Sequence, residues 1–174
     1  MATQQKAFTG FPYGLGAPGV DAVVVTNPVT LPQTTTKAIF TITGGPIEVM
    51  KIFGVVTTVI GSVANATKLQ AVITVGTAQT TDICATVDLN AAPVNNIYEL
   101  VTSFATAAVL GTAGLYPVAS STLYTRFVML PGVIQINCAG SDGGTGMMQW
   151  YMHYKPLSVG VSQAGLVSIT SPTT

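Results

Sequence analysis

The stretch GGTGMMQWYMHYKPL, residues 143–157, contains the only tryptophan and the only histidine of this 174-residue chain. At a period of two, one face of the stretch is apolar and the other is polar or aromatic. The apolar face consists of Met148, Trp150, Met152 and Tyr154. The opposite face consists of Gln149, Tyr151, His153 and Lys155. This alternation predicts a half-buried β-strand, with Trp150 in the core and His153 pointing outward.

His153 lacks the sequence companions that histidine chemistry requires, which are an orienting acid and a nucleophile or a second metal ligand. No acidic residue lies in a recognised acid–histidine motif; these residues are Asp21, Glu48, Asp82, Asp88, Glu99 and Asp142. Metal sites usually combine two or more His and Cys residues at ligand spacing, whereas Cys84 and Cys138 lie far apart in the sequence. We therefore expect His153 to be a surface or interface residue, and we expect no catalytic residue, no metal and no cofactor.

Charged residues make up only 7% of the chain, and its formal net charge is zero. A soluble domain usually contains about 25% charged residues. A protein with so few charges and no net charge associates readily with other copies or other proteins. The composition therefore predicts a surface that neighbouring subunits cover. The basic residues are scattered singly, at Lys6, Lys37, Lys51, Lys68, Arg126 and Lys155. Because phosphate binding needs clustered Lys and Arg, this pattern argues against a nucleic-acid partner.

The longest uncharged run, residues 100–125, is long enough to span a membrane. It contains Pro117, glycines and many Thr and Ser residues, so we expect no transmembrane helix. The N-terminal MATQQKAFTG has no apolar core of a secretory signal. Without such a signal, Cys84 and Cys138 are expected to be free buried thiols, although cysteines on neighbouring strands can also form a disulfide.

Short alternating runs broken by turn residues continue along the rest of the chain. They span residues 37–43, 47–60, 69–75, 82–89, 121–130 and 132–138. Turn signals about 8–12 residues apart, with many Val, Ile and Thr, predict an all-β antiparallel sandwich or barrel. One helical turn is expected within 97–109, from the spacing of Ile97, Leu100, Val101 and Phe104.

The first 36 residues mix proline, glycine and aromatic residues and alternate little. They predict an extended N-terminal arm, residues 1–36, that is too apolar to be a disordered linker. Its interface anchors are expected to be Phe8, Phe11, Tyr13 and Leu15. The string GLGAPG within it has the spacing of a dinucleotide fingerprint but is expected to be a loop, since no strand precedes it and no helix follows. Residues 37–158 are then the sandwich, and residues 159–174 a last short strand and polar tail.

Residues 132–164, GVIQINCAGSDGGTGMMQWYMHYKPLSVGVSQA, carry a resemblance to a known family. A strand, a glycine-rich turn, and a strand with Trp150, Tyr154 and Pro156 before a small-residue tail resemble the C-terminal end of jelly-roll decoration, or cement, proteins of tailed bacteriophage capsids. The resemblance implies a jelly-roll fold and a homotrimer that binds the major capsid protein and stabilises the icosahedral head. It also implies synthesis in the host cytoplasm and a final location on the capsid surface of the virion.

Two other interpretations stay open at this point. Related sandwiches occur in phage tail, baseplate and receptor-binding proteins, and exposed Tyr or Trp along a carbohydrate groove would favour that class. A jelly-roll enzyme or small-ligand protein is the third interpretation, and a metal in the purified protein would favour it. We expect a virion structural protein that is not an enzyme, with no nucleic-acid or membrane partner.

Overall fold

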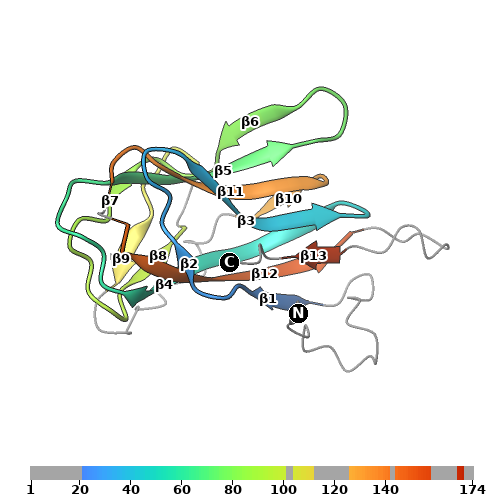
Figure 1. Cartoon of the computed structure of the whole chain (residues 1–174). Coiled ribbons are helices and arrows are strands. Elements are labelled where there is room, and N and C mark those ends of the chain that lie inside the picture. The colour runs from blue at the N-terminus through green and yellow to red at the C-terminus, as the bar shows by residue number, and fades with distance from the viewer. Residues whose placement is uncertain (1–20, 101–103, 112–125, 142–143, 158–167, 171–174) are drawn as a thin grey trace, which may run out of the picture.

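Two antiparallel β-sheets pack face to face in the computed structural model, which describes residues 21–100, 104–111, 126–141, 144–157 and 168–170 (Figure 1). Sheet A contains β1 (Ala22–Val25), β2 (Val29–Thr30), β4 (Ile47–Thr58), β8 (Ile97–Glu99), β9 (Val109–Gly111), β10 (Phe127–Met129) and β12 (Met147–Pro156). Sheet B contains β3 (Thr36–Thr43), β5 (Ala66–Ile73), β6 (Gln79–Asp82), β7 (Val87–Asp88), β11 (Gly132–Cys138) and β13 (Ser168–Thr170). The described residues contain no helix. The prediction of an all-β antiparallel sandwich is confirmed.

The strand pairs are nested along the chain. The innermost pair is β5 with β6, and β4 with β10, β3 with β11 and β1 with β12 follow outward in turn. Two further pairs, β12 with β4 and β11 with β5, join these nested pairs into the two sheets. As a result, β12 lies between β1 and β4 in sheet A, and β11 lies between β3 and β5 in sheet B. These two interior strands both come from the last third of the described chain.

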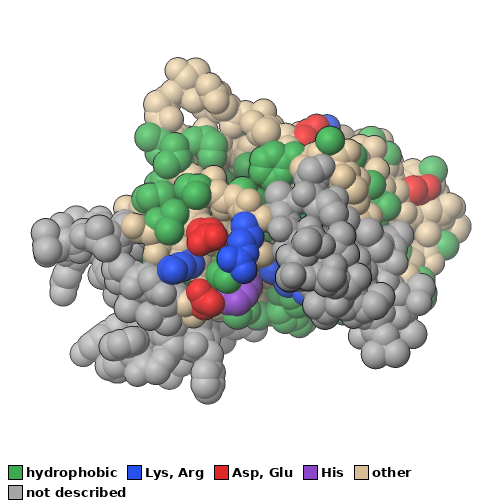
Figure 2. All heavy atoms as spheres, turned by 180° about the vertical axis from the view of Figure 1, so that it is seen from behind, with side chains coloured by type: hydrophobic (Ala, Val, Ile, Leu, Met, Phe, Trp, Pro, Cys, Tyr) green, Lys and Arg blue, Asp and Glu red, His purple; other side chains and the backbone are tan. Residues whose placement is uncertain are grey.

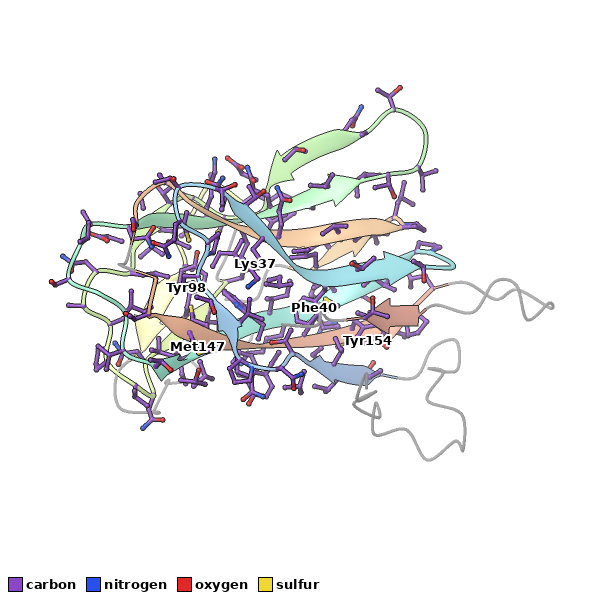
Figure 3. All side chains as sticks on the ribbon, viewed as in Figure 1. Lys37, Phe40, Tyr98, Met147 and Tyr154 are labelled. Atoms are coloured by element: carbon purple, nitrogen blue, oxygen red, sulfur yellow. The ribbon has the colours of Figure 1, made fainter. Side chains whose placement is uncertain are left out.

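Strand β12 alternates between buried and partly exposed residues, as its sequence predicts. Its inward side chains are fully or almost fully buried; they are Met148, Trp150, Met152 and Tyr154. From the facing sheet, Phe40 also points into the layer between the sheets, as does Tyr98 from β8 (Figure 3). The rings of Tyr98 and Trp150 meet edge to face, with their centroids 5.6 Å apart. Burial of these large apolar side chains supplies the main stabilisation of the sandwich.

Gly54 makes room for this aromatic pair. It lies opposite Trp150 on one side and Tyr98 on the other, so a residue without a side chain stands between two large rings. A Cβ atom at Gly54 would lie 2.8 Å from Met148 Cε and 3.0 Å from two atoms of the Trp150 ring. The ring is enclosed on all sides, so it has little freedom to move away.

We therefore expect Gly54→Ala to lower the free energy of unfolding by about 1–3 kcal/mol, the usual range for overpacking a core. Urea denaturation followed by circular dichroism measures the change. If the contact with the indole is the cause, the loss should shrink in a Trp150→Phe background, where the smaller ring leaves room. An equal loss in both backgrounds would contradict this explanation.

A β-bulge in β4 sets the direction of Lys51. His153 pairs with Lys51 and the next residue of β12, Tyr154, pairs with Val49, so Met50 is the extra residue. Because of this extra residue, Val49 and Ile52 both point into the core although they are three positions apart. Lys51 consequently points outward beside His153.

The structure corrects two predictions made from the sequence, the length of the arm and a helical turn. The predicted arm does not extend to residue 36, because β1 and β2 within it pair with β12 and complete that edge of sheet A. In the described part of 97–109 there is no helical turn, because Ile97 lies in β8 and Val109 begins β9; Val101 lies outside the described residues. Pairing of β8 with both β4 and β9 satisfies its backbone within the sheet, and this outweighs the helical spacing of its apolar residues.

Strand β13 pairs with β3, so the last short strand that the sequence predicts is present at Ser168–Thr170. Most of the long uncharged run 100–125 lies outside the described residues. Among the residues that are described, no helix has the length and hydropathy of a membrane span.

Candidate interaction surface

The outer face of sheet A gathers most of the charged side chains of the described chain (Figure 2). Of the twelve charged residues, Lys6 and Asp142 lie outside the described ranges, and six of the other ten lie on or beside this face. We define the charged face as these six residues and the histidine: Asp21, Glu48, Lys51, Glu99, Arg126, His153 and Lys155. Three acidic and three basic residues sum to zero charge when His153 is neutral.

The pair of Lys51 and Glu99 is the most buried part of the charged face. Lys51 Nζ lies 2.7 Å from Glu99 Oε1, and the Glu99 side chain is only 1% exposed. Oε1 is buried and makes no regular hydrogen bond. The short N–O distance nevertheless places the ammonium group directly on the carboxylate, so Lys51 is what compensates the buried negative charge.

Two further contacts between side chains of opposite type lie exposed on the charged face. His153 Nε2 lies 3.8 Å from Asp21 Oδ2, and Arg126 Nη1 lies 3.9 Å from Glu48 Oε1. At these distances, and in contact with water, such pairs contribute about 0–1 kcal/mol each to stability. These two contacts therefore add little to the stability of the fold.

An aromatic pair borders the charged face. The rings of Phe53 and Tyr151 are stacked, with centroids 4.7 Å apart and planes 1° from parallel. Lys51 Nζ lies 5.3 Å from the centroid of the Phe53 ring, within the range of a cation–π contact. One face of the Phe53 ring is therefore covered by Tyr151, and one face of the Tyr151 ring is covered by Phe53.

The charged face combines acidic and basic groups in balanced number. Histidine and aspartate at 3.8 Å form a loose, open pair, and within the described ranges no group of three or more His, Cys, Asp or Glu is placed to hold a metal ion. Interleaved positive and negative groups of zero total charge suit an uncharged or mixed-charge protein surface better than a polyanion.

Cys84 and Cys138 are both buried and form no disulfide, which agrees with the prediction of buried thiols. Cys84 Sγ accepts a hydrogen bond from the Leu69 amide at 3.2 Å and lies 3.6 Å from the Tyr98 hydroxyl. Cys138 Sγ lies 3.5 Å from Thr67 Oγ1. Burial raises the pKa of the Cys84 thiol, and burial raises the pKa of the Tyr98 hydroxyl well above its ordinary value.

These raised pKa values predict a loss of stability at alkaline pH. The unfolded chain ionises its thiols above about pH 8.5, whereas the folded chain keeps Cys84 neutral. Stability is thus complete below that pH and falls as the pH rises toward the higher pKa of the folded state. Urea midpoints measured between pH 7 and pH 10 should decline, and Cys84→Ala should make the decline shallower. An unchanged pH dependence in Cys84→Ala would contradict this role of the thiol.

The structure places the sequence-predicted residues in two groups. The four predicted core residues of β12 lie together between the sheets, while Phe8, Phe11, Tyr13 and Leu15 of the arm lie outside the described residues. His153 is on the outer face, 36% exposed, beside an aspartate that sequence reasoning did not connect with it. The charged face itself was missed, because the lysines and arginine that appear scattered in the sequence converge only through strand pairing.

The chain was compared with protein-family models, with curated proteins and with solved structures, and none of the three comparisons gave a significant match.

Proposed function

We propose that this chain is a virion structural protein, a capsid decoration (cement) protein that binds the head of a tailed bacteriophage as a homo-oligomer and stabilises it. The observation that carries the proposal is the distribution of charge over the described surface. Six of the ten described charged residues belong to one face, which leaves the remaining surface short of the charges that keep a solitary protein soluble. In a capsid, neighbouring subunits would cover this charge-poor part of the surface.

The strand order supports the jelly-roll part of the proposal. A jelly roll is a two-sheet sandwich built from Greek-key connections, and it arises when a long antiparallel ribbon of nested strand pairs rolls up. The four nested pairs, from β5–β6 to β1–β12, have this order. A jelly-roll decoration protein would use the sandwich as a rigid body and its faces and termini as contacts.

The aromatic pair bears on the tail or receptor-binding alternative. Carbohydrate recognition uses a ring face that is open to the sugar. Among the described residues, Trp150 is buried, and Phe53 and Tyr151 stack on each other. Lys51 lies over Phe53 as well. Because these rings are buried or covered by other side chains, they favour a structural role over the binding of a sugar.

The direct test is the location of the protein in purified particles. Electron microscopy of particles carrying a tagged chain should show the added density on the head in regular positions. Added density on the tail would instead identify the chain as a tail or baseplate protein. A chain that never co-purifies with particles would overturn the proposal.

Deletion of residues 1–20 tests the predicted arm in the same particles. We expect the truncated chain to keep the circular dichroism spectrum and the Trp150 fluorescence of the sandwich, because the core begins at β1. We expect its co-purification with particles to fall, since the apolar anchors of the arm are lost. Loss of the folded spectrum, or undiminished co-purification, would contradict an arm that serves attachment.

A further inference from the structure

Strand pairing arranges the outward side chains of β4 and β12 in rows across sheet A. Residues that pair across two antiparallel strands point to the same face, with their Cβ atoms about 4.5–5.5 Å apart. The register therefore places each outward residue on or next to β4 beside one on or next to β12. We define the paired rows as four such pairs: Pro46 with Leu157, Glu48 with Lys155, Lys51 with His153, and Phe53 with Tyr151.

The first of the paired rows is apolar and exposed. The Leu157 amide donates to the Pro46 carbonyl at 3.0 Å, so these two residues lie side by side at the start of β4. Leu130 lies on the other side of Pro46, because the residue before it, the buried Met129, pairs with the buried Ile47. Leu130 and Leu157 are 47% and 38% exposed. Pairing thus joins three apolar residues into one patch at the end of the sheet.

The second of the paired rows alternates in charge. Lys155 pairs with Glu48 on one side, and Asp21, directly before β1, lies on its other side in the register of β1 with β12. Within the described part of the chain Lys155 forms no ion pair, and Glu48 reaches Arg126 only at 3.9 Å. The charges of this row are therefore only weakly compensated within one chain.

A two-fold axis that runs along the strands, between β4 and β12, exchanges the two members of every paired row. If a second copy is placed face to face about this axis, each residue meets the copy of its own neighbour in the row. Lys155 then meets Glu48 of the second copy, and Glu48 meets Lys155 of the second copy. Such a contact is isologous, so each attraction occurs twice. The charged row is thus complementary to itself.

The apolar and aromatic rows match themselves in the same way. Pro46 meets Leu157 of the second copy, and this contact removes apolar area of both chains from water. Phe53 meets Tyr151 of the second copy, so the stacked pair of one chain faces the stacked pair of the other. Like kinds of side chain therefore meet in both of these rows.

The row of Lys51 and His153 brings no uncompensated charge into the contact. Lys51 Nζ lies 2.7 Å from Glu99 of its own chain, and His153 lies 3.8 Å from Asp21. The charged face sums to zero when His153 is neutral, so two such faces do not repel each other through net charge. A second copy is therefore the partner that this surface favours, since one symmetry operation satisfies all four rows.

Sheet geometry permits this contact. Figure 2 shows the acidic, basic and histidine side chains of the face side by side on the molecular surface. Rotation about an axis parallel to the strands keeps the strand direction, so the two sheets meet in the aligned mode of sandwich packing, about 30° apart.

The face is also large enough for a specific contact. The strands β10, β4, β12 and β1, spaced about 4.8 Å apart, give it a width of about 19 Å. The distance along β12 from Gln149 to Leu157 adds a length of about 26 Å at about 3.3 Å per residue. Each copy thus contributes about 500 Å², and the pair reaches about 1,000 Å², the lower limit for a specific interface.

We propose that two copies of this chain associate face to face through the paired rows, about a two-fold axis between β4 and β12. The inference deepens the proposed function, since it rests on that function's homo-oligomer and names the surface that forms it. A two-fold contact is closed by two copies, so it predicts a dimer, whereas the resemblance to decoration proteins implies a trimer.

An exchange of charge between Glu48 and Lys155 tests the inference, with sedimentation velocity over a concentration series as the measurement. Glu48→Lys brings basic groups face to face, and Lys155→Glu brings acidic groups face to face. Each variant alone should raise the dissociation constant of the dimer by at least about tenfold. A mixture of the two should associate one to one with nearly the wild-type affinity, because every contact across the axis again joins opposite charges.

The matched controls make the same changes of charge on the other sheet. Lys68 Nζ lies 2.7 Å from Asp82 Oδ2 on sheet B, and Lys68→Glu and Asp82→Lys should both leave the dimer unchanged. Because Glu48 and Lys155 are also neighbours within one chain, urea midpoints followed by Trp150 fluorescence verify that each variant is folded. Recovery in the mixture can come only from contact between chains.

Three results would overturn the inference: a monomeric full-length chain, single variants that associate as the wild type does, or a mixture that does not pair. The particle experiment distinguishes these failures from failure of the proposed function. If the chain decorates particles but the charge exchange leaves its association unchanged, the inference alone is wrong. Association governed by the charge exchange, without any binding to particles, would contradict the proposed function and leave the inference in place.

Discussion

Trp150→Ala should lower the free energy of unfolding by about 3–5 kcal/mol, the usual loss for removing a large aromatic side chain from a core. The indole is fully buried and meets the Tyr98 ring edge to face. Its Nε1 atom is buried without a hydrogen-bond partner, so the loss comes from apolar burial and from the cavity left behind. Urea denaturation followed by far-UV circular dichroism measures the change without relying on tryptophan fluorescence.

Trp150→Phe is the control, because it keeps an aromatic ring and removes the unpartnered N–H group. It should cost clearly less than the alanine substitution. Equal losses for the two substitutions, or a loss below about 1 kcal/mol for alanine, would contradict a tightly packed tryptophan at the centre of the sandwich.

The second large effect is expected at the Lys51–Glu99 pair. Lys51→Met keeps the length of the side chain but leaves the Glu99 carboxylate buried and uncompensated, so we expect a loss of about 3 kcal/mol. Part of the Lys51 side chain is exposed, which places the expected loss at the lower end of the range for a buried pair. The free energy of unfolding in urea at pH 7 gives the value.

A double-mutant cycle separates this charge effect from packing. In the Glu99→Gln background, Lys51→Met should cost little, because no buried charge is left without a partner. His153→Ala provides the matched control on the same face, and its exposed pair with Asp21 predicts a change within about 0.5 kcal/mol. A Lys51→Met loss that is the same in both backgrounds would show that the ion pair is not its cause.

The sequence predicted the fold best where alternation is regular. From Met148 to Lys155 in β12 each apolar residue is followed by a polar or aromatic one, so the face of Trp150 could be assigned before any pairing was known. In β4 the extra residue Met50 shifts the alternation, and only the register against β12 identifies Lys51 as an outward residue. Short strands such as β8 carry too few residues to establish a period, so Ile97 and Leu100 were assigned to a helical turn.

The charged face could not be predicted for a different reason. Its seven residues come from segments spread between Asp21 and Lys155, and each segment alone contains one isolated charge or two. Their proximity depends on which strands pair and on how each pair is aligned, and one sequence contains neither kind of information. The small number of charged residues could be read directly from the composition, whereas their gathering on one face could not.

The positions of β11 and β12 have a consequence for how the chain folds during synthesis. Each is an interior strand of its sheet, so β3, β4 and β5 each lack one pairing partner until residues 132–156 have been made. From the end of β5 at Ile73 to the end of β12 at Pro156 is 83 residues, which take about 4–17 s at about 5–20 residues per second. During those seconds the early strands expose unpaired edges and apolar faces, so temperature and chaperone supply will govern how much chain reaches the folded state. We therefore expect the fraction of chain that folds to depend on events during synthesis, before β11 and β12 are complete.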